Sequence, residues 1–202
     1  MAAVIAELTM SLDGFVADRA DRVGPLFAWY ENGDVEVPTA VAEQWTFHTS
    51  DASAGYLRAS LARTGAVLGG RRVYDIGRWG EHGQHPWGVP VFVVTHEVPD
   101  GRSHHEPPFT FVTDGIESAI AQAQAAAGDK AVFVASANVA RQCLNAGLLD
   151  EIVVSLVPVL LGDGIRLFEH LERTPVELDG PRVIEGTGVT HLSYGVRRKR
   201  KR

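Results

Sequence analysis

The clearest pattern in the chain is a set of short apolar runs separated by mixed segments. Three of them are continuous and rich in valine: 66–69 (AVLG), 91–95 (VFVVT) and 131–135 (AVFVA). Such runs are typical of parallel strands that are covered on both faces. We expect the segment 4–11 (VIAELTMS) to belong to the same sheet.

Helical segments follow or separate these strands. Ser50 or Asp51 can serve as an N-cap, and a glycine follows each of the last two helical segments. Asp114, with Glu117 three residues later, resembles a capping box and predicts the start of the third helix. The predicted helices are 51–63, 71–78, 116–127 and 138–146.

The pattern changes in the last quarter of the chain. The segment 151–161 (EIVVSLVPVLL) predicts a strong strand that Pro158 interrupts. Segments 175–185 and 188–196 then read as two strands joined by a glycine-rich turn, which is typical of an antiparallel hairpin. Together these elements predict an α/β fold with one mixed sheet and helices on both faces.

Two long segments are irregular and rich in glycine and proline, 21–40 and 77–90. They carry aromatic residues that we expect to be exposed: Trp29, Tyr30, Trp79 and Trp87. Long loops in a compact domain are often lids or binding loops, which makes Trp29 a candidate substrate contact. The alternative is that the aromatic side chains only pin the loops onto the surface.

Composition agrees with a globular protein of ordinary size. The chain has 202 residues, 45% of them hydrophobic and 22% charged, which predicts one domain over residues 1–196. No apolar run approaches the length of a membrane span, and the N-terminus lacks the basic start of a signal peptide. The single cysteine excludes an intramolecular disulfide and suits a reducing compartment, so we expect a cytoplasmic protein.

The basic residues are unevenly distributed. Six of the 19 lie in residues 197–202, which leaves 13 against 25 acidic residues in the rest of the chain. Such a tail can bind nucleic acid or an anionic membrane, but an acidic body repels phosphate backbones. We therefore predict a disordered terminus, with no specific nucleic-acid or membrane partner.

Three predicted strands end in residues that suit a ligand site. In open α/β sheets, ligands bind beyond the carboxyl ends of the strands. The three corners are Gly69, Gly70, Arg71 and Arg72; Thr95 and His96; and Ala135, Ser136, Ala137 and Asn138.

The first and third corners lead directly into predicted helices. Free N–H groups at a helix start attract phosphate, and small residues let it approach them. Arg71 and Arg72 add planar donors that can grip a phosphate monoester. Two such corners fit a dinucleotide, and arginine beside the ribose favours NADPH over NADH. Taken alone, either corner is better explained as a structural feature, a tight turn or solvated arginines. Their coincidence at one edge of the sheet is what favours a ligand site.

Four stretches resemble the dihydrofolate-reductase-like family that includes the reductase domain of bacterial riboflavin biosynthesis. They are SLDGFVAD (11–18), VLGGRRVYD (67–75), the corner at 132–142, and AGLLDEIVVSLVPVLLGDGIRLF (146–168). The resemblance implies a three-layer α/β/α fold, mostly parallel with an antiparallel C-terminal hairpin. It also implies an NADPH-dependent reductase of a pterin, a pyrimidine or a similar heterocycle, and members often form dimers.

Carried over by position, the resemblance assigns roles to the corner residues. Gly70, Arg71 and Arg72 correspond to the 2′-phosphate and adenosine corner, and Thr95 to a second cofactor contact. The pyrophosphate corner corresponds to Ser136, Ala137, Asn138 and Val139. The edge of the nicotinamide and substrate pocket corresponds to Asp13, Gly14, Leu161 and Gly162.

The sequence departs from the family pattern at one corner. Many members have glycine at positions 135–137, where this chain has Ala-Ser-Ala. Without glycine, pyrophosphate approaches a more crowded backbone, so cofactor affinity is expected to be modest or the cofactor to differ. Ser136 can donate a hydroxyl to phosphate, or it can simply be the N-cap of the following helix.

Asp13 is the predicted catalytic group, as a substrate anchor or proton relay. Hydride transfer to a C=N or C=O group needs a proton, and the protein supplies mainly positioning and electrostatics. Asp13 can equally be a turn residue in Asp-Gly. Asp75 is a weaker candidate. The acid that contacts the pterin in dihydrofolate reductases has no secure counterpart, since Glu43 and Asp51 lie only near its position, which puts folate in doubt as the substrate.

The eight histidines do not form a recognisable metal motif, so no metal is predicted. Two functional classes stay open. The first is an NADPH-dependent reductase of a heterocyclic or carbonyl substrate, acting as a homodimer. The second is a nucleotide-binding protein of the same fold that has lost catalysis.

Overall fold

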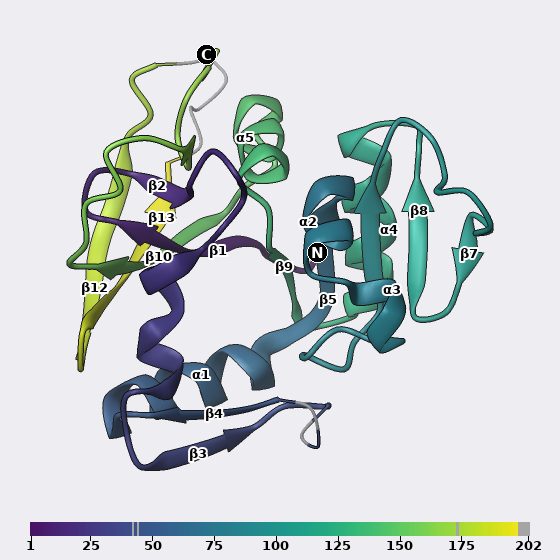
Figure 1. Ribbon diagram of the computed structural model, residues 1–202. Helices are drawn as coiled ribbons and strands as arrows, with labels where there is room; N and C mark the ends of the chain where they lie inside the picture. The colour runs from purple at the N-terminus through teal and green to yellow at the C-terminus, as the bar shows by residue number, and fades with distance from the viewer. Residues whose placement is uncertain (42, 44, 173, 198–202) are drawn as a thin grey trace.

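The computed structural model of the protein describes residues 1–41, 43, 45–172 and 174–197. A nine-stranded sheet runs through its centre (Figure 1). Its strands, in spatial order, are β12 (Leu178–Gly186), β13 (Val189–Val196), β10 (Glu151–Val157), β1 (Val4–Ser11), β9 (Ala131–Val134), β5 (Thr64–Gly70), β6 (Val91–Val94), β8 (Phe109–Val112) and β7 (His105–Glu106).

The sheet is mixed and mostly parallel. The six strands from β10 to β8 run parallel to one another, whereas β13 is antiparallel to β10, and β12 and β13 form a hairpin. A short antiparallel strand, β7, closes the other edge against β8. The predicted mixed sheet with a C-terminal hairpin is therefore confirmed, and the antiparallel strand at the far edge is an addition that the sequence pattern did not predict.

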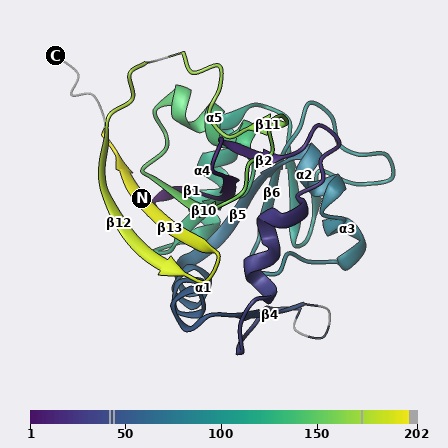
Figure 2. The same ribbon diagram turned by 60° about the vertical axis from the view of Figure 1, so that its left-hand side comes forward.

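Helices cover both faces of the sheet (Figures 1 and 2). The main helices are α1 (Asp51–Arg63), α2 (Arg71–Ile76), α3 (Trp79–His82), α4 (Ile116–Ala127) and α5 (Ala137–Ala146). Alternate residues of β1 serve opposite faces: Val4 and Ala6 lie in the core under α4 and α5, and Ile5 lies in the core under α1. The three-layer α/β/α fold follows from this alternation.

Smaller elements complete the fold beside the sheet. A 3-10 helix, η1 (Gly24–Glu31), precedes a hairpin of β3 (Val35–Pro38) and β4 (Thr46–Thr49). A second small pair joins β2 (Phe15–Ala17) to β11 (Ile165–Arg166). The sequence reading treated the regions that hold η1 and β3 as irregular, because neither has a clear apolar period.

Most predicted helix boundaries are confirmed, with one correction. Ser50 caps α1 and its hydroxyl accepts a bond from the Ser53 N–H, while Gly128 and Gly147 end α4 and α5. The predicted capping box before α4 is wrong. Gly115 occupies the N-cap and no side chain caps the helix, because the backbone there has φ 104°, which favours glycine over Asp.

The expectation that the loop aromatics are exposed is also wrong. Trp29 and Trp79 are only 2% and 7% exposed, and Tyr30 and Trp87 are half-buried. Trp29 belongs to η1, which packs beside α1, and Trp79 begins α3, which packs against β5. The segments that carry them are therefore part of the core of the protein.

The predicted basic tail is described only at its first residue. The Arg197 side chain lies against the carboxylates of Glu177 and Asp179 at the end of the hairpin. The prediction for residues 198–202 falls outside the described part of the chain.

Candidate functional site

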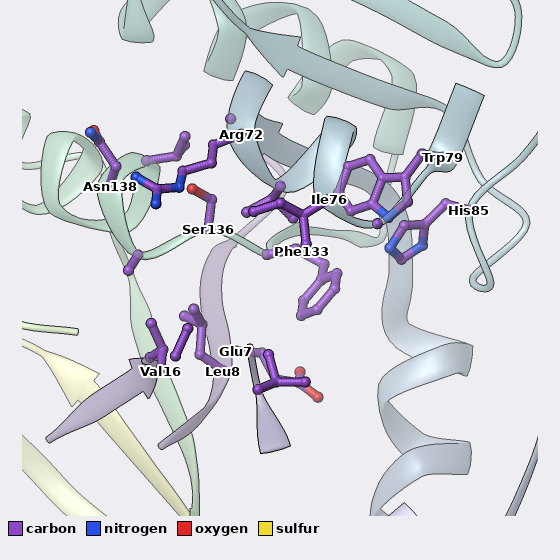
Figure 3. A pocket seen from close by; sticks show the side chains of 18 of the residues that line it. Glu7, Leu8, Val16, Arg72, Ile76, Trp79, His85, Phe133, Ser136 and Asn138 are labelled. Atoms are coloured by element: carbon purple, nitrogen blue, oxygen red, sulfur yellow. The ribbon is translucent and has the colours of Figure 1, made fainter. Parts of the chain in front are cut away.

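A large cleft opens at the carboxyl ends of the parallel strands, as the rule for open α/β sheets predicts. Its volume is about 1250 Å³. Residues from the ends of β5, β6 and β9 line it, together with α2, the start of α5 and the two aromatic loops. Figure 3 shows Arg72, Ser136 and Asn138 together at one end, with Glu7 and Leu8 of β1 apart from them in another part of the cleft. We call the end of the cleft at Gly70, Arg72 and Ser136 the rim. The floor is the part lined by Glu7, Tyr56 and the aromatic side chains.

Two of the predicted corners meet at the rim. A Cβ built on Gly70 lies 3.2 Å from the Ser136 hydroxyl oxygen and 3.5 Å from a methyl carbon of Val139. Gly70 thus faces the start of α5 across a gap that a side chain would fill. The two turns are 66 positions apart in sequence and form one side of a single cleft.

The start of α5 offers donors without internal partners. Ser136 sits at the N-cap, yet its hydroxyl makes no capping bond and has no partner within the described residues, although the residue is only 5% exposed. The first N–H groups of a helix also lack intrahelical partners. An unused hydroxyl, unpaired N–H groups and the Gly70 gap fit the phosphates of a dinucleotide.

The arginines of the rim are paired with carboxylates of the protein. Arg71 lies 2.8 Å from Asp75 on the same helix, and Arg72 lies 2.5 Å from Asp21. Asp21 has a left-handed backbone, with φ 62°, in a turn that the Asp18 carboxylate holds by accepting two N–H bonds. A phosphate at this end must therefore compete with Asp21 or Asp75.

The remaining predicted cofactor residues divide into two groups. Thr95, His96, Ala135, Ala137 and Asn138 line the cleft, as do Arg71, Arg72 and Val139. Gly69 does not, and a Cβ there would lie 2.9 Å from the ring of Trp79. The need for glycine at position 69 thus comes from packing under Trp79.

The group predicted around Asp13 lies elsewhere. The Asp13 carboxylate accepts bonds from the Ser11 hydroxyl and from the N–H groups of Leu161 and Gly162, at 2.5, 3.2 and 2.7 Å. These bonds, the one from Ser11 first, lower the pKa of Asp13. None of Asp13, Gly14, Leu161 and Gly162 lines the cleft, whereas Trp29, the other predicted substrate contact, does.

The walls of the floor are mainly aromatic. Trp87 stacks on Phe133 with ring centres 5.3 Å apart and planes 9° from parallel. Trp29 and Tyr30 contact each other on η1, with centres 4.2 Å apart. All four residues line the cleft, which gives it flat apolar surfaces of the kind that bind planar ring systems.

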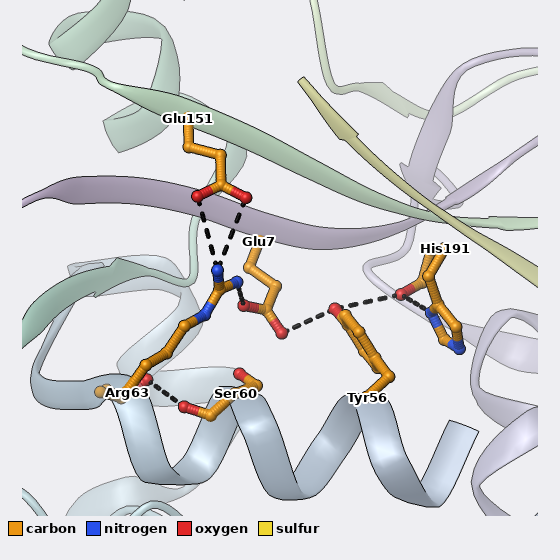
Figure 4. Close-up of polar contacts among 8 residues, drawn as sticks. Glu7, Tyr56, Ser60, Arg63, Glu151 and His191 are labelled. Atoms are coloured by element: carbon orange, nitrogen blue, oxygen red, sulfur yellow. Dashed lines mark hydrogen bonds and ion pairs between the residues drawn. The ribbon is translucent and has the colours of Figure 1, made fainter. Parts of the chain in front are cut away.

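A buried polar network lies against these walls (Figure 4). Glu7 of β1 accepts a bond from the Tyr56 hydroxyl at 2.6 Å and pairs with Arg63 at 2.9 Å. Ser155 of β10 lies 3.5 Å from the Tyr56 hydroxyl and 2.9 Å from Nδ1 of His191. The polar network consists of Glu7, Ser53, Tyr56, Arg63, Ser155 and His191, of which Glu7, Tyr56 and Ser155 line the cleft.

Burial sets the protonation of the network. His191 is 1% exposed, and burial lowers its pKa to about 4, so the ring is neutral near pH 7. Burial, with the Glu7 charge nearby, raises the pKa of Tyr56 well above its usual value. His85, at another wall of the cleft, is likewise buried, and its pKa falls to about 3.

Sequence reasoning did not predict this network. Its one visible signal is Glu7, an acidic residue in the middle of the otherwise mostly apolar strand VIAELTMS. Tyr56, Ser155 and His191 carry no local signal, because their partners are 36 to 138 positions away along the chain.

The fold and the cleft define an open α/β protein with a ligand site at the carboxyl ends of its parallel strands. The sequence profile of the RibD C-terminal domain matches residues 2–185. The chain belongs to the RibD C-terminal domain family, and the resemblance to the riboflavin-biosynthesis reductases is confirmed.

Solved structures show the same fold. A candidate riboflavin biosynthesis protein from Shewanella sp. PV-4 is 24% identical, with a TM-score of 0.70 over 97% of this chain and 99% of that one. A pyrimidine reductase-like protein from Corynebacterium diphtheriae is 12% identical, with a TM-score of 0.57 over 98% and 93%.

A larger relative shares the fold over part of its length. The Thermotoga maritima diaminohydroxyphosphoribosylaminopyrimidine deaminase/5-amino-6-(5-phosphoribosylamino)uracil reductase is 11% identical, with a TM-score of 0.60. The match covers 96% of this chain and 56% of that protein. A comparison with curated protein sequences gives no match.

Two further features are absent from the described residues. None of the helices there is long and apolar enough to span a bilayer. In the same part of the chain, His, Cys, Asp and Glu side chains do not gather in threes or more in a way that could hold a metal ion.

Proposed function

We propose that this protein is an NADPH-dependent reductase of a planar heterocycle of the pyrimidine or pterin type, or of a small carbonyl compound. Family membership supports a reductase. The cofactor, the substrate and the roles of individual residues are our proposal.

The observation that carries the proposal is the pairing of rim and floor in one cleft. The rim has the Gly70 gap, the unpartnered Ser136 hydroxyl and the uncapped start of α5. The floor has parallel aromatic surfaces next to a polar patch. A volume of about 1250 Å³ has room for a dinucleotide and a second ring.

In this proposal each part of the cleft has a task. When bound, NADPH supplies a hydride to the substrate. Ser136 and the N–H groups of Ala137 to Val139 bind the pyrophosphate, and Arg71 or Arg72 binds the 2′-phosphate. Trp29, Phe133 and Trp87 hold the substrate ring and keep water away from the reacting carbon.

Asp13 takes a supporting role in the proposal. Its carboxylate ties the turn after β1 to the loop after β10 by bonds to Leu161 and Gly162. That tie holds the carboxyl ends of β1 and β10 together, and Glu7 and Ser155 lie on those two strands. We therefore assign Asp13, Gly14, Leu161 and Gly162 to shaping the site from behind, without contact to substrate.

A nucleotide-binding protein without catalysis is the second candidate. It is favoured by the Ala-Ser-Ala corner and by the ion pairs that occupy Arg71 and Arg72. Both candidates predict binding of a nucleotide, and only the first predicts turnover. The cytoplasmic location and the homodimer also remain proposals, based on the single cysteine and on the family resemblance.

The test is a titration followed by a turnover screen. NADPH, NADH and FMN are titrated by fluorescence into the wild type, Arg71→Ala and Arg72→Ala. NADPH is expected to bind, and at least one arginine variant should weaken NADPH about tenfold more than NADH. Equal losses for both cofactors remove the 2′-phosphate assignment, and no NADPH binding removes the proposed function.

NADPH oxidation is then followed at 340 nm with three probes. These are 5-amino-6-(5-phosphoribosylamino)uracil, 7,8-dihydrofolate and 9,10-phenanthrenequinone, which represent pyrimidine, pterin and carbonyl substrates. Turnover of any probe identifies its class. Binding of NADPH without turnover of any of them favours the candidate that has lost catalysis.

A further inference from the structure

The hydrogen bonds from Ser53 to Glu7 in the polar network all donate in the same direction. This direction follows from the number of hydrogens that each side chain can donate. Glu7 faces Arg63 as a carboxylate, so it can only accept, and Tyr56 must use its one hydroxyl hydrogen on Glu7. The Tyr56 oxygen then accepts from the Ser155 hydroxyl at 3.5 Å.

The number of available hydrogens also determines how Ser155, His191 and Ser53 bond to one another. Because Ser155 has used its only hydrogen, it must accept from Nδ1–H of His191, 2.9 Å away. A neutral imidazole then has its acceptor at Nε2, which takes the hydrogen of Ser53 at 3.0 Å. The chain therefore donates from Ser53 through His191, Ser155 and Tyr56 to Glu7, which assigns the Nδ1–H tautomer to His191.

The sheet register and ring stacking place the members of this chain next to one another. Ser155 and His191 are directly opposite each other on β10 and β13, and Tyr56 stacks on the imidazole with ring centres 3.9 Å apart. The titratable side chains around Tyr56 are Glu7 of β1, Tyr30 of η1, His191 of β13 and Arg63 of its own helix. The members of the chain are buried, and the end that reaches the cleft is the Tyr56 hydroxyl with Glu7 and Ser155.

The outer end of the chain lies close to the surface. A Cβ built on Gly186, in the β12–β13 turn, would lie 2.2 Å from the Ser53 hydroxyl oxygen. Ser53 itself is fully buried, whereas Gly186 beside it is half-exposed, and the side chains of Val189 and Ser50 lie next to the same point. A movement of that turn would open the Ser53 hydroxyl to water.

We propose that Tyr56 is the proton donor of the reduction and that Ser155, His191 and Ser53 return a proton to it from solvent. This inference rests on the proposed function. It assigns Glu7 and Arg63 to positioning, because they orient the Tyr56 hydroxyl at the cleft. It replaces the prediction that Asp13 supplies the proton.

The reaction balances in protons and electrons. A reduced nicotinamide gives a hydride to the carbon of a C=N or C=O group, and the pair of electrons of that double bond moves to nitrogen or oxygen. That atom takes the Tyr56 proton, so the Tyr56 hydroxyl gives up its bond to Glu7 in this step. Tyr56 takes the proton of Ser155, Ser155 that of His191 Nδ1, and His191 Nε2 that of Ser53, and water restores Ser53. This pass leaves the His191 hydrogen on Nε2, so the hydroxyls and the imidazole ring must turn to restore the starting order before the next turnover. The nicotinamide is oxidised and the substrate gains one hydride and one proton.

The kinetic test uses pairs of variants matched in chemistry. Tyr56→Phe keeps the ring stacked on His191 and removes the hydroxyl, and Tyr74→Phe is its control at a buried tyrosine of α2 that does not line the cleft. Ser155→Ala breaks the chain, and Ser60→Ala is its control, because Ser60 is buried on α1 and its hydroxyl has no partner in the described residues. Activity is measured with whichever of the three probes named above the wild type turns over.

Tyr56→Phe is expected to lower kcat about 100-fold or more, as loss of a general acid does, with NADPH affinity unchanged. Ser155→Ala should lower kcat about tenfold and make it rise as pH falls from 8 to 6, because bulk acid must then supply the proton. The two control variants and the wild type should show no such rise.

A second readout needs neither cofactor nor turnover. Nitrogen-15 NMR of the His191 ring is expected to show the Nδ1–H tautomer in the wild type and in Ser60→Ala, and loss of that preference in Ser155→Ala. An Nε2–H ring in the wild type overturns the donor order and the proposal with it.

The outcomes separate this inference from the proposed function. A wild type that turns over a probe while Tyr56→Phe keeps the kcat of Tyr74→Phe overturns the proton donor and leaves the reductase standing. A wild type that turns over none of the probes overturns both.

Discussion

The rim and the floor of the cleft are built on opposite principles. At the rim, helix N–H groups and the Ser136 hydroxyl lack internal partners, and the arginines are held by exposed carboxylates. On the floor, each member of the polar network is bonded to another, and all of them except the half-buried Arg63 are buried. Exposed pairs exchange partners at little cost, whereas buried ones do not. The difference supports our proposal that ligand phosphates bind at the rim, while the polar network of the floor is formed before any ligand arrives.

The largest effect on this difference between rim and floor is expected from a side chain that fills the space beside Gly70. Gly70→Val places a branched side chain against Ser136 and Val139, since even a Cβ there lies 3.2 Å from the Ser136 oxygen. We expect NADPH affinity to fall about 100-fold, or about 2.7 kcal/mol. Titration calorimetry measures the affinity.

Gly55→Ala is the control, at an exposed position of α1 with open space around it. It should keep NADPH affinity and raise stability by about 0.5–1 kcal/mol through helix propensity. Unchanged affinity in Gly70→Val would show that the gap holds no ligand.

Lowering the pH tests whether two buried histidines stay neutral in the folded protein. His85 and His191 have folded-state pKa values lowered to about 3 and about 4, so between those values and about 6.5 the unfolded chain binds more protons than the folded one. Their contribution is complete above pH 6.5 and is lost as pH falls. We expect the free energy of unfolding to drop by about 2 kcal/mol per histidine between pH 7 and pH 5.

Denaturant unfolding at a series of pH values measures this slope. His191→Phe should make the slope shallower, and His170→Gln, at an exposed position, should not change it. An identical slope in His191→Phe and the wild type would mean that the ring is not held neutral by burial.

The Ser136 hydroxyl, which has no partner in the described protein, gives a further test of the rim. Ser136→Ala removes a donor that bonds nothing in the described protein, so the free energy of unfolding should change by less than about 0.5 kcal/mol. NADPH affinity should fall about tenfold or more, as for the loss of one bond to a charged group. A large loss of stability with unchanged affinity would reverse the assignment and make Ser136 a structural cap.

The smallest expected effect concerns the ion pairs of the rim. Asp21→Asn frees Arg72 and should tighten NADPH about threefold relative to NADH, because an exposed pair is worth less than about 1 kcal/mol. The gain should disappear at 1 M salt. Asp75→Asn frees Arg71 in the same way, and the variant that shows the gain identifies the arginine that reads the 2′-phosphate.

The parts of the fold with a regular pattern could be predicted from the sequence. The valine runs at 66–69 and 131–135 became β5 and β9, and the glycine-rich turn of the last hairpin lies where it was expected. The aromatic loops could not be predicted, because proline and glycine hide the 3-10 helix that buries Trp29.

The site was predictable at its rim and not at its floor. Gly70 and Ser136 follow strands of one parallel sheet, so the topology alone brings them to the same edge. The role of Tyr56 depends on Ser155 and His191, which reach it only after β10 and β13 have paired. A local sequence pattern does not indicate contacts between residues so far apart along the chain. Asp13 illustrates the converse, since a conspicuous motif residue serves a turn outside the cleft.

The most direct test of the account is a crystal structure of the protein with NADPH bound. The account predicts the pyrophosphate at the start of α5 beside Ser136, and the nicotinamide on the floor within reach of the Tyr56 hydroxyl. A cofactor bound outside this cleft, or one whose nicotinamide points away from Tyr56 and Glu7, would contradict it.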